Sequence, residues 1–161
     1  MEDKFRVFFL VAKKLNALGV EPVLFGSLGV STVINLEMPI NDVDILIPDI
    51  WVEDRWRELI VLMSALDFSV YDELEHEFIR DSQKVAFAGE SILGDISLTK
   101  SKLVRMATGE LKYYIPTASQ FLEIYRYSLN DGYRIKKRKD NEKIKLLTEY
   151  LKRNENNFLE R

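Results

Sequence analysis

The segment from Asp42 to Ile47 constrains the fold of this chain more than any other. Its sequence, Asp-Val-Asp-Ile-Leu-Ile, begins with alternating acidic and apolar residues, and Pro48-Asp49 closes it. Successive side chains of a β-strand point to opposite faces of a sheet. The segment is therefore predicted to be a strand that carries Asp42 and Asp44 on one face and apolar side chains on the other.

A turn between a strand and a helix is predicted shortly before this segment. Pro22–Phe25 is a short apolar run that ends at Gly26-Ser27, which predicts a buried strand, a tight turn and then a helix over residues 28–35. Glycine lets the backbone approach a ligand closely, and a serine hydroxyl can donate a hydrogen bond. The following helix presents free N–H groups and a positive dipole end, so the turn is suited to bind an anion such as a phosphate.

Hydrophobic periodicity predicts the remaining elements. Helices are expected over residues 3–18, from 56 to 66 with Asp49 as N-cap, over 100–108 ending at Gly109, after a capping box of Thr117 and Gln120, and around 144–151. Strand-like runs cover 68–71, 75–80 and 84–88, and the last two are expected to form a hairpin. This order predicts an α+β fold with a mixed sheet in residues 1–98 and a C-terminal helical part in residues 99–161.

Composition excludes several classes of function. With 26 acidic and 23 basic residues, the net charge of −3 gives no overall positive field for nucleic acid. The absence of cysteine excludes disulfides, thiolate zinc sites and a cysteine nucleophile, and the single histidine excludes sites built from several imidazoles. Because the longest apolar stretch is broken by glycine, serine and threonine, and no secretory leader is evident, we expect a cytoplasmic protein with no membrane partner.

The two predicted features together supply the parts for phosphoryl or nucleotidyl transfer. Asp42 and Asp44 on one strand face repel each other unless a cation lies between them. A divalent ion, Mg²⁺ or Mn²⁺, is the expected partner because it prefers carboxylate and phosphate oxygens. Gly26 and Ser27 would hold the triphosphate of a nucleotide substrate beside that ion.

Phe25-Gly26-Ser27 followed by Asp42-Val-Asp44 resembles the signature of the DNA polymerase beta-like nucleotidyltransferase superfamily. In that family a GS turn follows the first strand and a DxD pair lies on the second. The resemblance implies a small mixed sheet with helices on one side. The stretch Lys137-Arg-Lys-Asp140 is similar to the RxKD stretch of abortive-infection-type toxin nucleotidyltransferases, with Lys137 where that pattern has arginine.

The sequence departs from the family pattern at Ala86. The family usually carries a third carboxylate in a later apolar-Asp-apolar run, and the corresponding run here is Lys84-Val-Ala-Phe-Ala88. If the hairpin turns at Ser82-Gln83, Glu77 lies on the same face as Ala86, one residue pair away. Glu77 is therefore the predicted third acid, and Asp95 is the second candidate. If neither serves, the chain is a nucleotide-binding protein that has lost the reaction.

A basic run lies before the last predicted helix. It consists of Arg134, Lys136, Lys137, Arg138 and Lys139. Such a run is either a solvated loop and helix start or a patch for a triphosphate or polynucleotide backbone. Cations at a helix N-terminus are unfavourable without a local reason, so Lys137 and Lys139 are the expected phosphate contacts.

The sequence thus predicts a metal-dependent nucleotidyltransferase that moves a nucleoside monophosphate from a nucleoside triphosphate to a hydroxyl acceptor. Asp42, Asp44 and Glu77 are the predicted catalytic residues, and Asp42 and Asp44 are the predicted metal ligands. The acceptor is left open among a protein, a tRNA and a small molecule such as an aminoglycoside, and so is the oligomeric state. The alternative is a degenerate nucleotide-binding or interaction protein with the same fold, or one component of a toxin–antitoxin pair.

Overall fold

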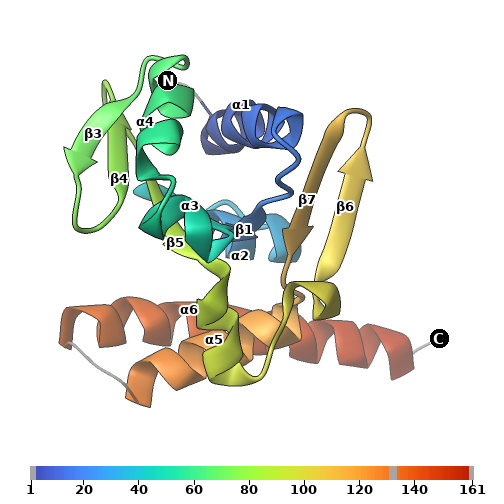
Figure 1. Cartoon of the computed structure of the whole chain (residues 1–161). Helices are drawn as coiled ribbons and strands as arrows, with labels where there is room; N and C mark the ends of the chain where they lie inside the picture. Colours follow the sequence, from blue (N-terminus) through green and yellow to red (C-terminus); the bar gives the residue numbers. More distant parts are fainter. Residues whose placement is uncertain (1–2, 131–133, 160–161) are drawn as a thin grey trace.

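The computed structural model describes residues 3–130 and 134–159, including all their side chains except those of residues 134–138 and 156–159. Seven strands form one sheet in the order β3-β4-β5-β2-β1-β7-β6 (Figure 1). Their bounds are Val23–Phe25 (β1), Asp42–Ile47 (β2), Ser69–Asp72 (β3), Glu77–Arg80 (β4), Gln83–Gly89 (β5), Val104–Thr108 (β6) and Leu111–Ile115 (β7). The strand predicted from Asp42 to Ile47 is confirmed and lies in the middle of this sheet.

The sheet is mixed. Strand β2 pairs antiparallel with β1 and parallel with β5, while β1 pairs parallel with β7. The two outer pairs, β3–β4 and β6–β7, are antiparallel hairpins. An α+β architecture with a mixed sheet, as expected from the sequence, is confirmed.

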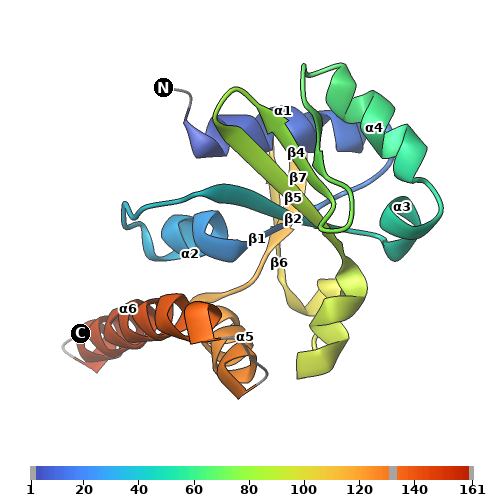
Figure 2. The ribbon, with the colours of Figure 1, turned by 90° about the vertical axis from the view of Figure 1, so that its left-hand side faces the viewer.

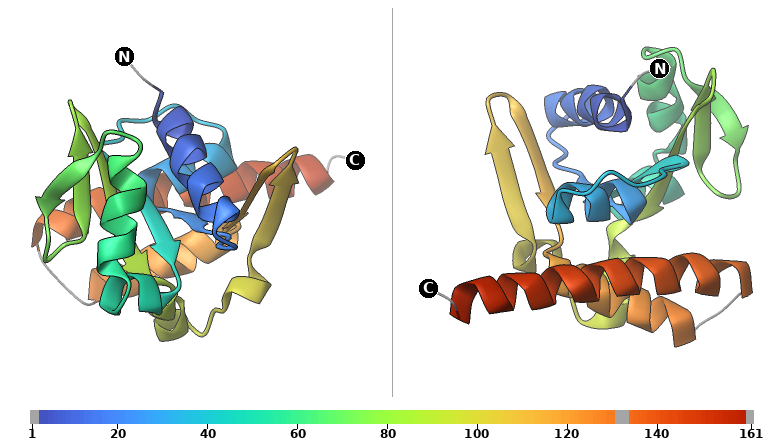
Figure 3. Two further views of the ribbon diagram at one scale, coloured as in Figure 1. Left: turned by 45° about the horizontal axis from the view of Figure 1, so that its top comes forward. Right: turned by 180° about the vertical axis from the view of Figure 1, so that it is seen from behind.

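Helices cover both faces of this sheet. Their bounds are Lys4–Ala17 (α1), Gly26–Ile34 (α2), Asp49–Glu53 (α3), Trp56–Ser64 (α4), Ala118–Asn130 (α5) and Arg134–Leu159 (α6). In Figure 1, α1 and α4 lie above the central strands β1 and β5, whereas α5 and α6 cross below them. Figure 2 shows α5 and α6 side by side, and the right-hand view of Figure 3 shows α6 running along the whole width of the molecule.

The face of the sheet beneath α1 and α4 is largely apolar, with the buried Gln83 of β5 hydrogen-bonded to Lys4 of α1. Val43, Ile45 and Ile47 of β2 have no exposed surface. The ring of Phe8 in α1 lies 5.1 Å from that of Tyr113 in β7, centroid to centroid. Burying this face removes a large apolar area from water, which is the main favourable contribution to folding.

The β4–β5 hairpin forms as predicted, but with a different register. The sequence predicts a turn at Ser82-Gln83, whereas Gln83 pairs with Arg80 and the turn residue Asp81 has a positive φ of 54°. As a result, Glu77 lies directly opposite Ala86 rather than one pair away. The shift is by two residues, so the faces on which the side chains lie are unchanged.

The prediction of a helix over residues 100–108 is wrong. Residues 100–102 form a short 3₁₀ turn, and residues 104–108 form β6, which turns at Gly109 into β7. These strands lie within the predicted helical part, residues 99–161, yet β7 pairs with β1 of the core and β6 pairs with β7, so both extend the core's sheet. The first α-helix in that part of the chain is therefore α5.

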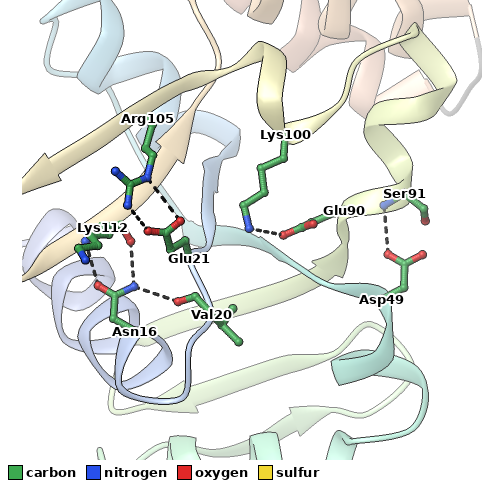
Figure 4. A network of polar contacts seen from close by, with 9 residues as sticks. All are labelled: Asn16, Val20, Glu21, Asp49, Glu90, Ser91, Lys100, Arg105 and Lys112. Atoms are coloured by element: carbon green, nitrogen blue, oxygen red, sulfur yellow. Dashed lines mark hydrogen bonds and ion pairs between the residues drawn. The ribbon is translucent and has the colours of Figure 1, made fainter.

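Polar contacts attach this hairpin to the core (Figure 4). The side-chain amide of Asn16 donates to the carbonyl oxygens of Val20 and Lys112, each at 2.9 Å, and its oxygen accepts from the Lys112 N–H at 2.9 Å. The Arg105 guanidinium donates to the Glu21 carboxylate. Asn16 thus forms hydrogen bonds with both backbone groups of Lys112, as a residue of a neighbouring strand would.

The single helix expected from residue 56 with Asp49 as its N-cap is also corrected. The segment contains two helices, α3 and α4, and Asp49 is the first residue of α3. Its carboxylate instead accepts from the backbone N–H of Ser91 at 3.0 Å, which ties α3 to the segment after β5 (Figure 4). Asp49 therefore serves as a hydrogen-bond acceptor for the segment after β5 and not as the N-cap of a helix.

The capping box at the start of α5 is confirmed. The Gln120 side chain accepts from the Thr117 N–H at 2.9 Å, and the Gln120 N–H donates to the Thr117 hydroxyl at 3.2 Å. Helix α5 packs closely on α2, because a Cβ atom added at Gly29 would lie 2.6 Å from Cζ of Phe121.

Among the described residues, no helix is long and apolar enough to cross a membrane.

Candidate active site

A row of side chains crosses four strands on the face of the sheet opposite the α1 side. Glu77 of β4 is paired with Ala86 of β5, Ala86 with Asp44 of β2, and Asp44 with Phe25 of β1. Paired residues on neighbouring strands project to the same face. Glu77 and Asp44 therefore face the same space, and between them Ala86 contributes only a methyl group.

Asp42 lies on the same face two residues before Asp44, as the alternation of strand side chains predicts. Both aspartates are half-buried, whereas Val43 between them is fully buried. The pKa of Glu77 is raised, first because burial penalises its charged form and then because the Asp42 carboxylate repels it. Glu77 therefore lies close enough to Asp42 for their charges to interact.

Gly26 makes room for Asp44. Helix α2 begins at Gly26, whose φ is +61°, and a Cβ atom added there would lie 2.1 Å from Oδ2 of Asp44. That overlap is far below any van der Waals contact, so only glycine fits. The turn expected to bring the backbone close to a phosphate also brings it against one of the two aspartates.

The N-terminus of α2 faces the same space. The helix has nine residues, and its N-cap residue, Phe25, makes no side-chain capping hydrogen bond. The first N–H groups of a helix have no partner within the helix, and the dipole makes this end positive. Ser27 lies in this first turn.

The C-terminal helices form the wall opposite these strands. Asp140 at the start of α6 is buried and accepts from the Ser128 hydroxyl of α5 at 2.7 Å. Burial raises the pKa of Tyr125 on α5, and the Asp44 and Asp140 carboxylates raise it further. Tyr125 therefore lies near both the acid of β2 and the acid of α6, and all three line the same space.

These groups enclose a cleft of about 790 Å³. Six of the predicted site residues line it, namely Gly26, Ser27, Asp42, Asp44, Glu77 and Lys139. Asp95, the second candidate for the third acid, is exposed and is not among the lining residues. Lys137 falls in residues 134–138, whose side chains lie outside the described part, so its predicted role stays a prediction.

The C-terminal helices contribute polar lining residues that were not assigned to the site from the sequence. Tyr125, Ser128, Asp140 and Lys143 come from α5 and α6. Lys143 follows Lys139 by four residues, the spacing that places two side chains on one helix face. The sequence predicts that the last helix begins after residue 140, whereas α6 begins at Arg134. Lys139 was therefore not expected to lie on the same helix as Lys143.

Comparison with known proteins places the chain in a family. No protein-family model matches it. It is 34% identical over 152 residues to the uncharacterized protein YnaI of Bacillus subtilis (strain 168), which covers 90% of this chain and 96% of YnaI. The chain belongs to the YnaI family. The match to YnaI runs through most of both chains.

Solved structures identify the fold of this YnaI-family chain. The solution structure of the antibiotic-resistance factor ANT(2'')-Ia superimposes with a TM-score of 0.52 at 13% identity, over 99% of this chain and 97% of that one. The crystal structure of ANT(2'')-Ia in complex with adenylyl-2''-tobramycin gives 0.55 at 11% identity, over 92% and 88%. At such identities the likeness shows the fold alone, and the expected nucleotidyltransferase fold is confirmed.

Proposed function

We propose that this chain transfers a nucleoside monophosphate from a nucleoside triphosphate to a hydroxyl group of an acceptor and releases pyrophosphate. The observation that carries the proposal is the meeting of Asp42 and Asp44 with the uncapped N-terminus of α2 in one cleft. The nucleotidyltransferase fold supports it. The resemblance of residues 137–140 to the toxin-type nucleotidyltransferases remains part of this proposal.

The donor set fits a divalent ion held by two protein carboxylates. Asp42 and Asp44 supply oxygen donors on one strand face, and oxygen is what Mg²⁺ and Mn²⁺ prefer. Among the described residues there is no group of three or more acidic, histidine or cysteine side chains that could hold a metal. Phosphate oxygens of the nucleotide would complete the coordination. Once bound, the ion would neutralise charge on the phosphates and make the acceptor hydroxyl more acidic.

The phosphates of the nucleotide would bind to the first turn of α2. The N–H groups of that turn and the Ser27 hydroxyl would donate hydrogen bonds to phosphate oxygens, and the helix dipole favours the negative charge. The side chain of Lys139, exposed at the rim of the cleft, would contact the outer phosphates. These contacts orient the α-phosphorus for attack from the acceptor side.

Glu77 would accept the proton of the attacking hydroxyl. In the step, the acceptor oxygen bonds to the α-phosphorus, the bond from the α-phosphorus to the bridging oxygen of the β-phosphate breaks, and pyrophosphate leaves. A raised pKa brings a carboxylate closer to the range in which it works as a general base. The position of Glu77 directly opposite Ala86 supports the idea that it replaces the family's third acid.

A degenerate nucleotide-binding protein is the second candidate. Ala86 stands where the family carries its third acid, and this observation favours a chain that binds nucleotide without transferring it.

One assay separates the two candidates. The full chain is incubated with Mg²⁺, each of the four α-³²P-labelled nucleoside triphosphates, and acceptors of three kinds: the chain itself, tRNA and aminoglycosides. Aminoglycosides are included because the neighbour ANT(2'')-Ia was solved with adenylyl-2''-tobramycin. Label should move to an acceptor in the natural chain and not in Asp44→Ala.

The same assay tests the role of Glu77. Glu77→Gln should lose transfer but keep Mg²⁺-nucleotide binding nearly intact, because a base acts on the attacking hydroxyl in the transition state. An inactive natural chain that gains transfer on Ala86→Asp would establish the degenerate binder instead. A chain that binds none of the nucleotides would contradict both candidates.

A further inference from the structure

Lys143 of α6 is a partly buried cation in the wall of the cleft. Its side chain is half-buried and lines the same cleft as Asp44 and Asp140. Its Nζ atom lies 5.0 Å from the centroid of the Tyr125 ring, the range of a cation–π contact. One ammonium group therefore lies against an aromatic face in a cleft that two carboxylates also line.

The pKa of Lys143 reflects its burial and the charges around it. Burial lowers its pKa, whereas the carboxylates of Asp140 and Asp44 raise it again. One of these acids stands on α6 itself and the other on β2 of the sheet. The ammonium on the C-terminal wall thus lines the same cleft as Asp44 of the predicted metal-binding strand.

The two acids next to Lys143 differ in what else they bind. Asp140 accepts a hydrogen bond from Ser128, so it is held on the helical side of the cleft. Asp44 lies on the sheet beside Gly26, at the start of the phosphate-binding turn. An ammonium that interacts with Asp44 therefore lies close to the place where phosphates and a divalent ion would enter.

We propose that Lys143 is a positioning residue for the nucleotide: its ammonium balances Asp44 while no metal ion is bound there and binds a phosphate oxygen once the Mg²⁺-nucleotide has entered. This inference rests on the proposed function. The long, flexible lysine side chain is a point charge with rotatable donors, so it can exchange one oxygen partner for another nearby.

This exchange gives Lys143 opposite effects on two ligands. A divalent ion alone competes with the ammonium for Asp44, because both are cations, so Lys143 weakens the binding of metal alone. A nucleoside triphosphate brings several negative charges, so Lys143 strengthens the binding of the Mg²⁺-nucleotide. A residue with only a structural role would change both affinities in the same direction when it is replaced.

The test measures both affinities in three variants of the full chain. Lys143→Met removes the charge and keeps the length, Lys143→Arg keeps the charge, and Lys145→Met removes an exposed charge on the same helix away from the cleft. Binding of Mn²⁺ alone is followed by electron paramagnetic resonance. Binding of the α,β-methylene analogues of ATP, CTP, GTP and UTP with Mg²⁺ is followed by calorimetry.

Lys143→Met should bind Mn²⁺ alone more tightly, by about threefold or more at low ionic strength. The same variant should bind the best Mg²⁺-analogue about tenfold more weakly, or 1.4 kcal/mol. Lys143→Arg should restore most of the nucleotide affinity, and Lys145→Met should change neither value. If Lys143→Met lowers the affinity for both ligands or for neither, while the natural chain binds both, this inference is wrong and the proposed function stands.

A second measurement uses the natural chain and does not depend on the folding of a variant. The side-chain resonances of Lys143, labelled with ¹³C and ¹⁵N and assigned against Lys143→Arg, should shift when Mg²⁺-analogue is added, and those of Lys145 should not. Resonances of Lys143 that stay in place at saturating analogue would overturn the inference. A natural chain that binds no analogue at all would overturn the proposed function, and this inference with it.

Discussion

Gly26 has room for a hydrogen atom and for nothing larger. Its backbone is in the left-handed region at φ +61°, and a Cβ atom would overlap Oδ2 of Asp44. Any side chain there displaces the aspartate, the backbone or both. The position therefore combines a backbone constraint with a constraint on the nearest predicted metal ligand.

Gly26→Val should accordingly reduce the affinity for a Mg²⁺-bound, non-hydrolysable nucleoside triphosphate by about tenfold or more, or 1.4 kcal/mol. Ser27→Ala removes one hydroxyl donor and leaves the backbone in place, so its effect should be milder. Calorimetry on both variants checks the order of the two effects. Normal binding by both would mean that this turn is not the phosphate site.

Glu77 should make the stability of the protein depend on pH. Its pKa is raised in the folded state above the ordinary value of 4.5, so between those two values the unfolded chain releases a proton that the folded chain keeps. Stability therefore falls as the pH rises through this window, and the loss persists above the folded pKa. Below the ordinary value both states are protonated, and the penalty disappears.

Glu77→Gln should therefore melt at a higher temperature than the natural chain at pH 7, in the absence of divalent ions. The difference should shrink as the pH falls below the ordinary pKa of a glutamate. Thermal melts at a series of pH values test this, with Glu110→Gln as the control because that glutamate is exposed in the β6–β7 turn region. A difference independent of pH would show that burial and repulsion at Glu77 do not cause it.

Helix α2 depends on a second glycine for its contact with α5. A Cβ atom at Gly29 would lie 2.6 Å from Phe121 and 3.1 Å from the carbonyl oxygen of Leu24, and neither a buried ring nor the backbone moves easily. Gly29→Ala should destabilise the protein by about 1–3 kcal/mol, although alanine favours helices over glycine. Chemical denaturation measures this change.

Gly94→Ala is the matched control, because no atom lies within 4 Å of the position of its Cβ. That substitution should leave the free energy of unfolding unchanged or raise it slightly, because alanine gives the unfolded chain less conformational freedom than glycine. Equal effects of the two substitutions would contradict the close packing of α2 against α5.

Prediction from the sequence succeeded for elements defined by their own residues. The strand Asp42–Ile47 has alternating residues and closing turn signals, and the α5 capping box is a local pattern of side chain and backbone. The prediction for residues 100–108 failed because their lysine, leucine, methionine and alanine favour a helix locally. Pairing with β7 instead makes residues 104–108 a strand. No residue within the segment carries that information.

The candidate site likewise contains residues that the sequence predicted and residues that only the fold brings to it. The residues on β1, α2 and β2 are close in sequence, so their spacing predicts that they meet. Tyr125 and Lys143 reach the cleft only because α5 and α6 pack beneath the sheet, and that packing depends on contacts far apart in the chain, such as Phe25 with Phe121. Long-range packing of this kind leaves little trace in local periodicity.

The whole molecule should unfold as one unit, although the sequence suggests a core of residues 1–98 and a separate helical part. The β6–β7 hairpin completes the sheet, and Phe121 of α5 and Leu147 of α6 are fully buried. Elements that share a hydrophobic core usually unfold together in a chain of this size. We therefore infer that the two parts form a single cooperative structure.

Two spectroscopic probes test this cooperativity. Both tryptophans, Trp51 and Trp56, lie in the first part, so fluorescence reports on that part, whereas far-ultraviolet circular dichroism also reports on α5 and α6. The two denaturation curves should have the same midpoint. A loss of circular dichroism ahead of the fluorescence change would show that the C-terminal helices separate first.

The pairing of Glu77 with Ala86 has a consequence for how relatives of this chain are sought. Residues on one rung of a β-ladder project to the same side, so an acid can pass from one strand to the next by two point substitutions, with the backbone unchanged. An alignment column follows a single strand and records only the alanine at position 86. A search that scored rungs instead of columns would keep such chains among the candidates for activity.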